Sequence, residues 1–532
     1  MPTGHTFDRE TRTGVPHSWH AAVLYVLAGS ALFILAYPPW NLGTATAWIA
    51  LIPLMAASTG APPTRAVLIG WSFGLLTHLG VFSWITQVPG LRWYHIMLLD
   101  GYLALYPAIW CLLAARWLTG ALWTQVSLAC AWVVLEYLRG HTGFLALPWI
   151  TLAQSQVDNL PLLQTASLFG ESAVTFLVVL GNLAIWNVLQ RERSRTAFWC
   201  AIPVLMSLGY GINCLASREA GDQTLSVATL NTSFPAPEEA RPDPLVRIQA
   251  QLEHLRQQFP AGADLLTLPE SAIVNPQLFP DHLDELRRLV DEHESVVIAG
   301  VAEATKFDRP VLPSGEAKAQ LRSEAWIITP EQAEPRRHVK SRLVPFAERT
   351  PLKGWLAWPA WLVPQKPEVE EGPQPQSYLL SNHVRIGIMI CWESLFADHA
   401  KTLVRDQANL LLMLSNEGWF GATAAGAQHN LTARLRAVET RRAVVVASNM
   451  GPSLIIDPFG RELASHSSTD GIQWVNAEVP IVTELSLYAR LGEIFVLSCG
   501  MIVLARVLSF WGMRNSPVAV FSDVTVRQRL GL

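Results

Sequence analysis

The chain has 532 residues, of which half are hydrophobic and only 15% are charged, whereas a soluble domain normally carries about a quarter charged residues. The deficit is uneven, because residues 20–215 contain few charges while residues 216–490 resemble an ordinary soluble sequence. The net charge of −4 favours no class of partner, and no basic stripe points to nucleic acid. The composition therefore predicts a membrane part and a globular part.

A helix needs about 20 mostly apolar residues to cross a bilayer. Eight segments come close to this requirement: about 20–37, 44–59, 66–86, 95–115, 118–137, 166–189, 197–215 and 494–513. A polar stretch precedes the first segment, and no small-residue cleavage site follows it, so it is expected to be an anchor and not a signal peptide.

Basic residues in short loops indicate how the helices are oriented, because they accumulate on the cytoplasmic side. With a cytoplasmic N-terminus, the inner segments hold ten arginines: Arg9, Arg12, Arg65, Arg116, Arg191, Arg193, Arg195, Arg514, Arg527 and Arg529. The outer loops before residue 215 hold only Arg92 and Arg139. Seven spans then place residues 216–490 outside, which in a bacterial inner membrane means the periplasm.

Polar residues also occur within the apolar part. His78, Asp100 and Glu171 lie at membrane depth, where such groups are costly and often functional, but structural pairing is at least an equal explanation. The stretch from Arg139 to Glu171 is too polar to lie wholly in lipid. We expect it to form a re-entrant or periplasmic loop that packs under the soluble domain.

The globular part alternates short β-rich runs with helical stretches, a pattern that predicts an α/β fold with a mixed sheet. Strands are expected at 224–230, 264–268, 295–301, 324–329, 384–390, 409–415, 443–448, 453–457 and 472–479. Helices are expected at 243–259, 281–293, 394–405 and 427–441, and residues 443–457 are expected to form a hairpin around Gly451-Pro452.

Residues 350–380 form a loop rich in proline and tryptophan, with Trp355, Trp358 and Trp361 at intervals of three. A long loop of this kind is usually functional or disordered, and tryptophan favours the membrane interface. Two interpretations stay open: a lid that dips into the outer leaflet, and a surface loop packed on its own aromatic side chains.

Three segments each end a strand with a reactive group. They are DLLTLPESAI with Glu270, RRHVKSRLVPFAERTPL with Lys340 and Glu348, and RIGIMICWESLF with Cys391 and Glu393. Cys391 is the one cysteine of six inside the soluble part, so it has no disulfide partner or zinc-site neighbours there. Ligands bind beyond the carboxyl ends of strands in open α/β sheets, which favours a site at these positions.

The residue types suit nucleophilic catalysis. A thiol attacks as a thiolate and needs a base or a nearby cation. Glu270 can take the proton of Cys391, and Lys340 can stabilise both the thiolate and a tetrahedral oxyanion. The backbone N–H of Trp392 is a candidate second oxyanion donor, and Glu348 could orient Lys340 or position an acceptor. Each residue alone has an ordinary structural explanation, such as a buried cysteine or a solvated lysine, and it is their joint order that favours a site.

These segments resemble the Glu, Lys and Cys motifs of the nitrilase superfamily, in the same chain order. More narrowly, the sequence resembles the apolipoprotein N-acyltransferase family, in which a nitrilase domain lies between the seventh and eighth membrane helices. Further matching blocks are KSRLVPFAE at 340–348, SNEGWFG at 415–421, QHNLTARLRAVETRR at 428–442, SNMG at 448–451, TGF at 142–144, PW at 148–149 and SQ at 155–156.

The resemblance implies a multi-pass helical membrane domain plus an α/β nitrilase-like domain built as an α-β-β-α sandwich. It divides the chain into a cytoplasmic tail at 1–19, a seven-helix membrane domain at 20–215, a periplasmic catalytic domain at 216–490, and the eighth helix with a second tail at 491–532. It also implies catalysis by Glu270, Lys340 and Cys391, with Glu348, Trp392 and Glu393 in support, and with no metal or cofactor.

By this resemblance, Cys391 takes an acyl chain from a membrane phospholipid as a thioester. The chain then passes to the N-terminal amine of the S-diacylglyceryl cysteine of an apolipoprotein. The sequence departs from the family pattern at Asn231, Trp392, Ala347 and the 350–380 segment. Two rivals therefore stay open: a membrane-tethered amidase or acyltransferase with another acceptor, and an inactive scaffold that binds lipids or lipoproteins.

Overall fold

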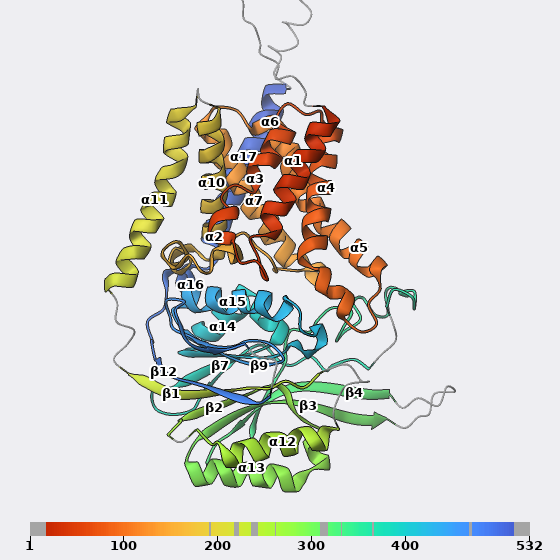
Figure 1. Cartoon of the computed structure of the whole chain (residues 1–532), viewed down its shortest axis with the longest axis vertical. Coiled ribbons are helices and arrows are strands. Elements are labelled where there is room, and N and C mark those ends of the chain that lie inside the picture. Colours follow the sequence, from red (N-terminus) through yellow and green to blue (C-terminus); the bar gives the residue numbers. More distant parts are fainter. Residues whose placement is uncertain are drawn as a thin grey trace, which may run out of the picture.

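The computed structural model describes residues 18–190, 193–217, 223–235, 243–260, 262–308, 318–330, 332, 334–363, 367–467 and 471–514. Figure 1 shows two stacked parts. One, the helical body, consists of the helices before the first strand together with the last helix. The other, the sheet body, contains both β-sheets and the helices that cover them.

The helical body contains a helix, or a pair of short helices, at each of the eight expected segments. They are α1 (Trp19–Ile34), α2 (Gly43–Thr46) with α3 (Leu51–Ser58), α4 (Pro63–Val81), α5 (Trp93–Leu103) with α6 (Leu105–Trp117), α7 (Leu122–His141), α9 (Ala166–Phe169) with α10 (Glu171–Leu189), α11 (Ser194–Ser217) and α17 (Ile494–Arg514). Within the segment expected at 166–189, Gly170 with φ 75° separates α9 from α10. The fifth segment lies at 122–141, a few residues later than expected.

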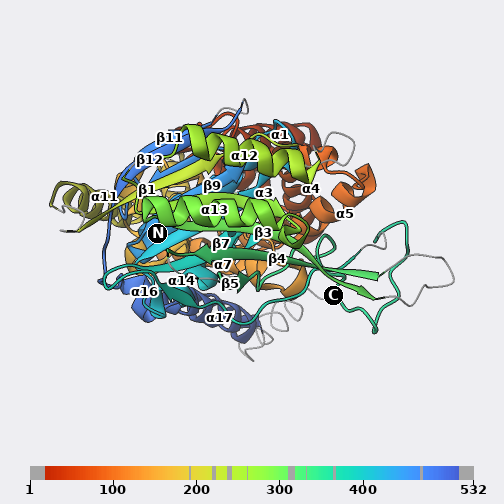
Figure 2. The same ribbon diagram turned by 90° about the horizontal axis from the view of Figure 1, so that it is seen from below.

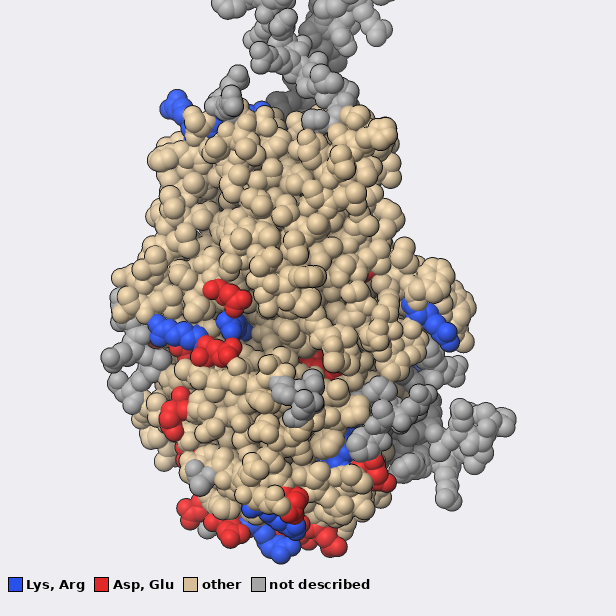
Figure 3. All heavy atoms as spheres, in the orientation of Figure 1, with Lys and Arg blue, Asp and Glu red and all other residues tan. Residues whose placement is uncertain are grey.

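Three of these helical stretches are long and apolar enough to cross a membrane: Trp93–Trp117, Glu171–Leu189 and Ser194–Ala216. Within the described ranges, four shorter apolar stretches accompany them. On the face that Figure 3 shows, uncharged side chains cover the helical body between its two ends. The crossing of all eight segments stays a prediction, and Arg9, Arg12, Arg191, Arg527 and Arg529 lie outside the described residues.

The sheet body contains two six-stranded mixed sheets. The first has the order β12-β1-β2-β3-β4-β5 and the second has the order β11-β10-β9-β8-β7-β6. The first sheet comprises β1 (Thr224–Asn231), β2 (Leu265–Val274), β3 (Val296–Asp308), β4 (Lys318–Ile328), β5 (Arg336–Val339) and β12 (Gln473–Pro480). The second comprises β6 (Ser377–Leu379), β7 (Arg385–Ile390), β8 (Leu410–Asn416), β9 (Ala443–Asn449), β10 (Ser453–Ile456) and β11 (Glu462–His466).

Each sheet has a parallel centre and antiparallel flanks. Strands β1, β2 and β3 run parallel, as do β7, β8 and β9, while β12, β4, β6 and β10 pair antiparallel with their neighbours. The expected hairpin over 443–457 is confirmed as β9 and β10. Nine strands were expected, and the structure adds the short strands β5, β6 and β11.

Helices cover the outer face of each sheet, which gives four layers (Figures 1 and 2). Helices α12 (Pro244–Gln257) and α13 (Pro280–His293) cover the first sheet, and α14 (Ala397–Arg405) and α15 (Ala425–Thr440) cover the second. Between the sheets, Val227, Ile298, Ile388 and Val445 share one buried core. The α-β-β-α sandwich expected from the sequence is confirmed.

The second sheet's helices face the helical body, and the two parts share a hydrophobic core. Leu435 and Val438 of α15 belong to the same buried cluster as Leu152 and Leu163 of the helical body. Burial of shared apolar surface stabilises the arrangement of the two parts. It also places the adjoining ends of β7 and β8 close to the helical body.

The polar stretch between Arg139 and Glu171 lies at this seam, as expected. Gln164 Nε2 donates to Phe459 O at 2.9 Å, and Arg434 pairs with Asp158 at 3.0 Å. This stretch folds into short helical turns, including η3 (Gln154–Gln156) and α8 (Leu160–Leu163). Its polar groups therefore find partners in the sheet body as well as within the stretch itself.

Candidate active site

Glu270 lies in β2, at a break in the pairing of β2 with β3. The register shifts between Leu268 and Ile273, and Ser271 has φ 56°. A Cβ at Gly300 of β3 would lie 2.2 Å from Pro269 O, so only glycine permits this close approach. The break turns the Glu270 side chain out of the regular alternation of the strand and into the site.

Lys340 follows β5 directly and is held by contacts at both its backbone and its amine. Its N–H donates to Ser323 O at 2.9 Å. Its Nζ lies 2.7 Å from Glu348 Oε1 and 3.2 Å from Glu270 Oε1, and its side chain is only 1% exposed. The structure thus brings Glu270 together with Lys340 and Glu348, which lie on a separate stretch of the sequence.

Cys391 is the residue directly after β7, as the sequence predicts. It has φ 50° and starts the 3₁₀ helix η5 (Cys391–Leu395). The expected helix at 394–405 is therefore two elements, η5 and α14, because the chain reopens to an extended conformation at Phe396. A non-glycine residue at positive φ is strained, and such strain often accompanies function.

The charges around Cys391 favour a protonated thiol and an ionised lysine at rest. Burial raises the pKa of the Cys391 thiol, the charge of Glu270 raises it further, and Lys340 opposes this. Burial would lower the pKa of Lys340, but Glu270 and Glu348 outweigh it and raise this pKa well above the ordinary value. Burial raises the pKa of Glu270, against the opposing effect of Lys340. Glu270, which interacts with the Cys391 side chain, is thus a base with a pKa closer to neutrality.

Glu393 acts as a clamp between two parts of the site. Its buried carboxylate accepts the backbone N–H groups of Ser341 at 2.7 Å, Arg342 at 3.0 Å and Ile390 at 2.8 Å. Burial would raise the pKa of Glu393, but His399, His338 and these donors hold it well below its usual range. The clamp fixes the end of β7, which carries Cys391, to the loop that follows Lys340.

A cavity of about 580 Å³ opens beside Trp392. Its wall includes Phe144 from the helical body and Ser341 and Arg342 from the loop after Lys340. It also includes Pro351 from residues 350–380, the Trp-rich segment. Ligand pockets usually measure about 300–1,000 Å³, so this cavity can hold part of a substrate. It lies where the helical body, residues 350–380 and the residues that follow Cys391 meet.

The structure shows how the tryptophans of residues 350–380 are packed or exposed, and the lid in the outer leaflet stays a prediction. Trp358 is packed, with its Nε1 donating to Pro351 O at 2.7 Å and its ring 5.2 Å from that of Phe346. Trp355 and Trp361 are 94% and 60% exposed. The segment is also tied to α5, because Tyr94 Oη donates to Trp361 O at 2.8 Å. One tryptophan anchors the loop, and two present apolar surface outward.

Two departures from the family pattern have different surroundings. Asn231 is fully buried at the end of β1, where its Nδ2 donates to Gly451 O at 2.7 Å and Ser453 Oγ at 3.0 Å, so it joins the two sheets. Trp392 lines the cavity, and its ring lies 5.8 Å from that of Phe396. Of these two, Trp392 is the one that bears on what the cavity accepts.

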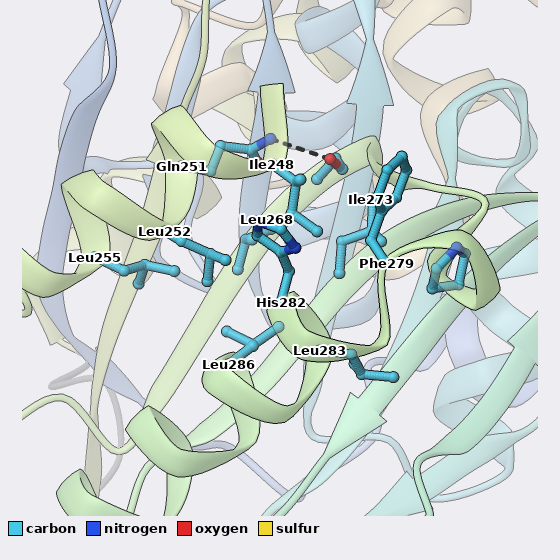
Figure 4. A pocket seen from close by; sticks show the side chains of 12 residues that line it. Ile248, Gln251, Leu252, Leu255, Leu268, Ile273, Phe279, His282, Leu283 and Leu286 are labelled. Atoms are coloured by element: carbon cyan, nitrogen blue, oxygen red, sulfur yellow. Dashed lines mark hydrogen bonds between the residues drawn. The ribbon is translucent and has the colours of Figure 1, made fainter. Parts of the chain in front are cut away.

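Another hollow, shown in Figure 4, lies between α12 and α13 on the opposite face of the molecule. Its wall is apolar apart from groups such as Gln251, whose Nε2 donates to Ala272 O at 3.0 Å. Its volume of about 10 Å³ admits at most one water molecule. Among the described residues, no group of three or more His, Cys, Asp or Glu side chains is arranged to hold a metal ion.

Sequence reasoning missed three buried polar residues beside Cys391: Ser394, Glu417 and His429. The last two lie inside the blocks SNEGWFG and QHNLTARLRAVETRR, which carried the resemblance without any role for these side chains. Their neighbours in the sequence, such as Asn416, Gln428 and Glu393, are polar too, so no local pattern marked these three residues.

Comparison with known proteins supports both parts of the architecture. Residues 29–184 match the model of the apolipoprotein N-acyltransferase N-terminal domain, and residues 239–481 match that of the carbon-nitrogen hydrolase domain. A yeast member of branch 10 of the nitrilase superfamily, from Saccharomyces cerevisiae, aligns with 49% of this chain and 92% of its own, at 18% identity and TM-score 0.36.

Full-length relatives extend the match across both parts. An apolipoprotein N-acyltransferase of Geobacter metallireducens is 30% identical over 500 residues, which cover 90% of this chain and 92% of the relative. One of Pseudomonas putida is 30% identical over 85% of this chain and 88% of its own. This chain is therefore an acyltransferase that belongs to the apolipoprotein N-acyltransferase family.

Proposed function

We propose that this enzyme transfers an acyl chain from a membrane phospholipid to the N-terminal amine of the S-diacylglyceryl cysteine of apolipoproteins. The observation that carries the proposal is the meeting of Glu270 and Lys340, with Nζ 3.2 Å from Oε1, beside Cys391 at its strained turn. Base, cation and nucleophile are thus within reach of one reacting carbonyl, next to a cavity at the foot of the helical body.

In the first step, Glu270 takes the proton of the Cys391 thiol, and the thiolate attacks the ester carbonyl of the lipid. A C–S bond forms, and the oxyanion is stabilised by Lys340 Nζ and the N–H of Trp392. The C–O bond to glycerol then breaks, and the proton on Glu270 passes to the leaving alkoxide. The products are a lysophospholipid and a thioester on Cys391.

In the second step, the acceptor amine attacks the thioester, and Glu270 takes one of its protons. A C–N bond forms, the C–S bond breaks, and the proton returns to the sulfur of Cys391. Because the first product leaves before the second substrate reacts, the kinetics are expected to be ping-pong. The free thiol is regenerated without any cofactor.

The proposal also includes the setting of the site. All eight apolar segments cross the bacterial inner membrane, with residues 20–215 as the membrane domain, 216–490 in the periplasm, 491–532 as the last helix and a tail, and 1–19 as a cytoplasmic tail. The even number of helical segments and the uncharged face of the helical body support this arrangement. The exposed Trp355 and Trp361 then lie at the outer leaflet, where both substrates are held.

The test is intact-mass analysis of purified protein incubated with phospholipid in detergent. Wild type is expected to gain one hydroxylamine-labile acyl chain, and Cys391→Ala none. Cys499→Ala, which alters a buried cysteine of α17, is the matched control and should acylate normally. Addition of a diacylglyceryl-cysteine peptide should discharge the adduct and acylate the peptide amine.

Two outcomes would overturn the proposal. No adduct with any common phospholipid, together with ammonia release from short amides, would make the protein a membrane-tethered amidase. If the acyl chain transfers to other amines but never to the lipopeptide, the acyl-enzyme part of the proposal stands and the proposed acceptor is wrong.

A further inference from the structure

Beside Cys391, three polar side chains from separate elements form a hydrogen-bonded chain. Ser394 lies in η5, His429 in α15, and Glu417 begins η6 (Glu417–Phe420). His429 Nδ1 lies 2.7 Å from Glu417 Oε1, and His429 Nε2 lies 2.9 Å from Ser394 Oγ. Ser394 Oγ in turn lies 2.9 Å from the backbone carbonyl oxygen of Cys391. The chain therefore ends on the peptide of the nucleophile itself.

The order serine, histidine, carboxylate is that of a hydrolytic triad, but the burial of these groups excludes a second nucleophile in this structure. Ser394 is 0% exposed, Glu417 1% and His429 2%, so no substrate carbonyl can reach the hydroxyl. The hydroxyl is also directed at Cys391 O. A buried polar network of this kind serves to fix a particular conformation.

The number of available protons determines how the chain is bonded. A serine hydroxyl has one proton, and if it donates to Cys391 O, it can only accept from His429. His429 Nε2 then donates to Ser394, and one proton lies between His429 Nδ1 and Glu417 Oε1. All three contacts are then satisfied together.

The surroundings of His429 supply no other charged partner among its described contacts. Its ring centroid lies 5.4 Å from that of Trp149, which belongs to the helical body. Ser415 Oγ adds a further hydrogen bond to Glu417 Oε1 at 2.9 Å. Glu417 is thus the one carboxylate seen in contact with the histidine in the described part of the chain.

We propose that Glu417, His429 and Ser394 form a positioning relay that holds the Cys391 carbonyl and thereby fixes the nucleophile's backbone at φ 50°. This inference rests on the proposed role of Cys391 as nucleophile. A residue strained at positive φ persists only when its surroundings over-determine it, and the relay supplies a fixed donor to its carbonyl. Release of that donor lets the peptide rotate and moves the sulfur relative to Glu270 and Lys340.

The decisive variant is Ser394→Ala, which removes one hydroxyl and leaves the fold's apolar contacts in place. We expect the single-turnover rate of acyl-adduct formation to fall about 10-fold, since small displacements of a reacting group cost rate steeply. The lipid concentration giving half-maximal rate should not change, because the relay does not line the cavity. Thr440→Ala is the matched control: its hydroxyl is also buried, lies on α15 like His429, and donates to Arg436 O at 2.7 Å, and its loss should have no effect on the rate.

A double variant separates a relay from independent structural effects. If the three residues act through one another, Ser394→Ala combined with His429→Gln should be no slower than the slower single variant. An unchanged rate in Ser394→Ala, or effects that multiply in the double variant, would overturn the relay. If His429→Gln does not fold, as judged by thermal unfolding, the result for Ser394→Ala decides alone.

Alkylation of Cys391 by iodoacetamide distinguishes this inference from the proposed function. If wild type forms no acyl adduct, the proposed function fails, yet the relay still predicts slower alkylation in Ser394→Ala than in wild type. Equal alkylation rates in that case would refute the relay as well.

Discussion

Glu348 holds the amine of Lys340 at 2.7 Å, closer than the 3.2 Å that separates the same amine from Glu270. The other oxygen of Glu348 accepts the Val344 N–H at 2.8 Å, so this carboxylate is itself fixed to its loop. In the proposed mechanism, Lys340 is therefore anchored by a group that takes no part in proton transfer. We expect Lys340 to stay in place when Glu270 becomes protonated during the first step.

Glu348→Gln is expected to lower kcat about 100-fold, because the amine loses its anchor and moves away from the oxyanion. Loss of one of the two carboxylates that raise the pKa of Lys340 should lower this pKa. The alkaline limb of the rate profile should then move to lower pH. Steady-state assays across pH measure both effects, with Glu253→Gln on the exposed surface of α12 as a control that changes neither. A normal kcat would show that Glu270 alone suffices to hold the lysine.

The acid limb of acyl-adduct formation should reflect Glu270, which must be ionised to accept the thiol proton. Burial raises its pKa above the ordinary value of about 4.3. Activity should therefore be lost on acidification at a higher pH than an exposed glutamate would give. Single-turnover rates between pH 4 and 8 (roughly the range over which carboxylates and imidazoles titrate) test this, and a limb at or below the ordinary value would contradict it.

Glu393→Gln should destabilise the protein by about 3 kcal/mol at neutral pH, since it removes a buried charge that several backbone donors share. The pKa of Glu393 is depressed in the folded state, so its contribution is present above the unfolded value and is lost as pH falls through the folded one. Thermal unfolding in detergent should show a gap between wild type and variant that is constant near neutrality and narrows in strong acid. A difference in Tm that widens on acidification would show that folding raises the pKa of Glu393 and does not lower it.

Asp100→Asn is expected to leave the enzyme active and to raise its Tm. Asp100 is 0% exposed in α5, and among the described residues neither of its carboxylate oxygens has a hydrogen-bond partner. A buried ionisable group without a partner is costly, and the amide removes the charge. Tm and adduct formation measured on the same preparation would decide: lost activity with retained stability would instead assign Asp100 a functional role.

Much of this fold could be predicted from the sequence, because its elements have strong local signals. The apolar run before Cys391 forms β7, and the helix expected at 427–441 forms α15, in which Leu431, Leu435 and Val438 have helical spacing. Strand β6 has three residues and β5 four, too few for a periodic pattern to be recognised. Their pairing depends on neighbours distant in the sequence, which no local pattern contains.

The residues of the site likewise divide into those that a sequence motif marks and those that no local pattern marks. Glu270, Lys340 and Cys391 end strands within recognisable motifs, and the structure brings the first two into contact. Ser394 and His429 carried no comparable signal, because a serine after a nucleophile and a histidine in a helix are ordinary residues. Only their meeting across two elements gives them a role, and such a meeting depends on the packing of η5 against α15.

Two consecutive residues of α15, Gln428 and His429, contact different parts of the molecule. Gln428 accepts from Trp84 Nε1 at 2.9 Å and donates to Pro38 O and Val81 O at 3.1 Å each, all within the helical body. His429, the next residue, reaches toward the nucleophile's peptide through Ser394. This helical turn thus connects contacts in the helical body to the proposed relay, and we expect a change in the tilt or spacing of the helices around Trp84 to shift the sulfur of Cys391. Under the proposed membrane setting, we therefore expect the reaction rate to depend on bilayer thickness as well as on substrate concentration.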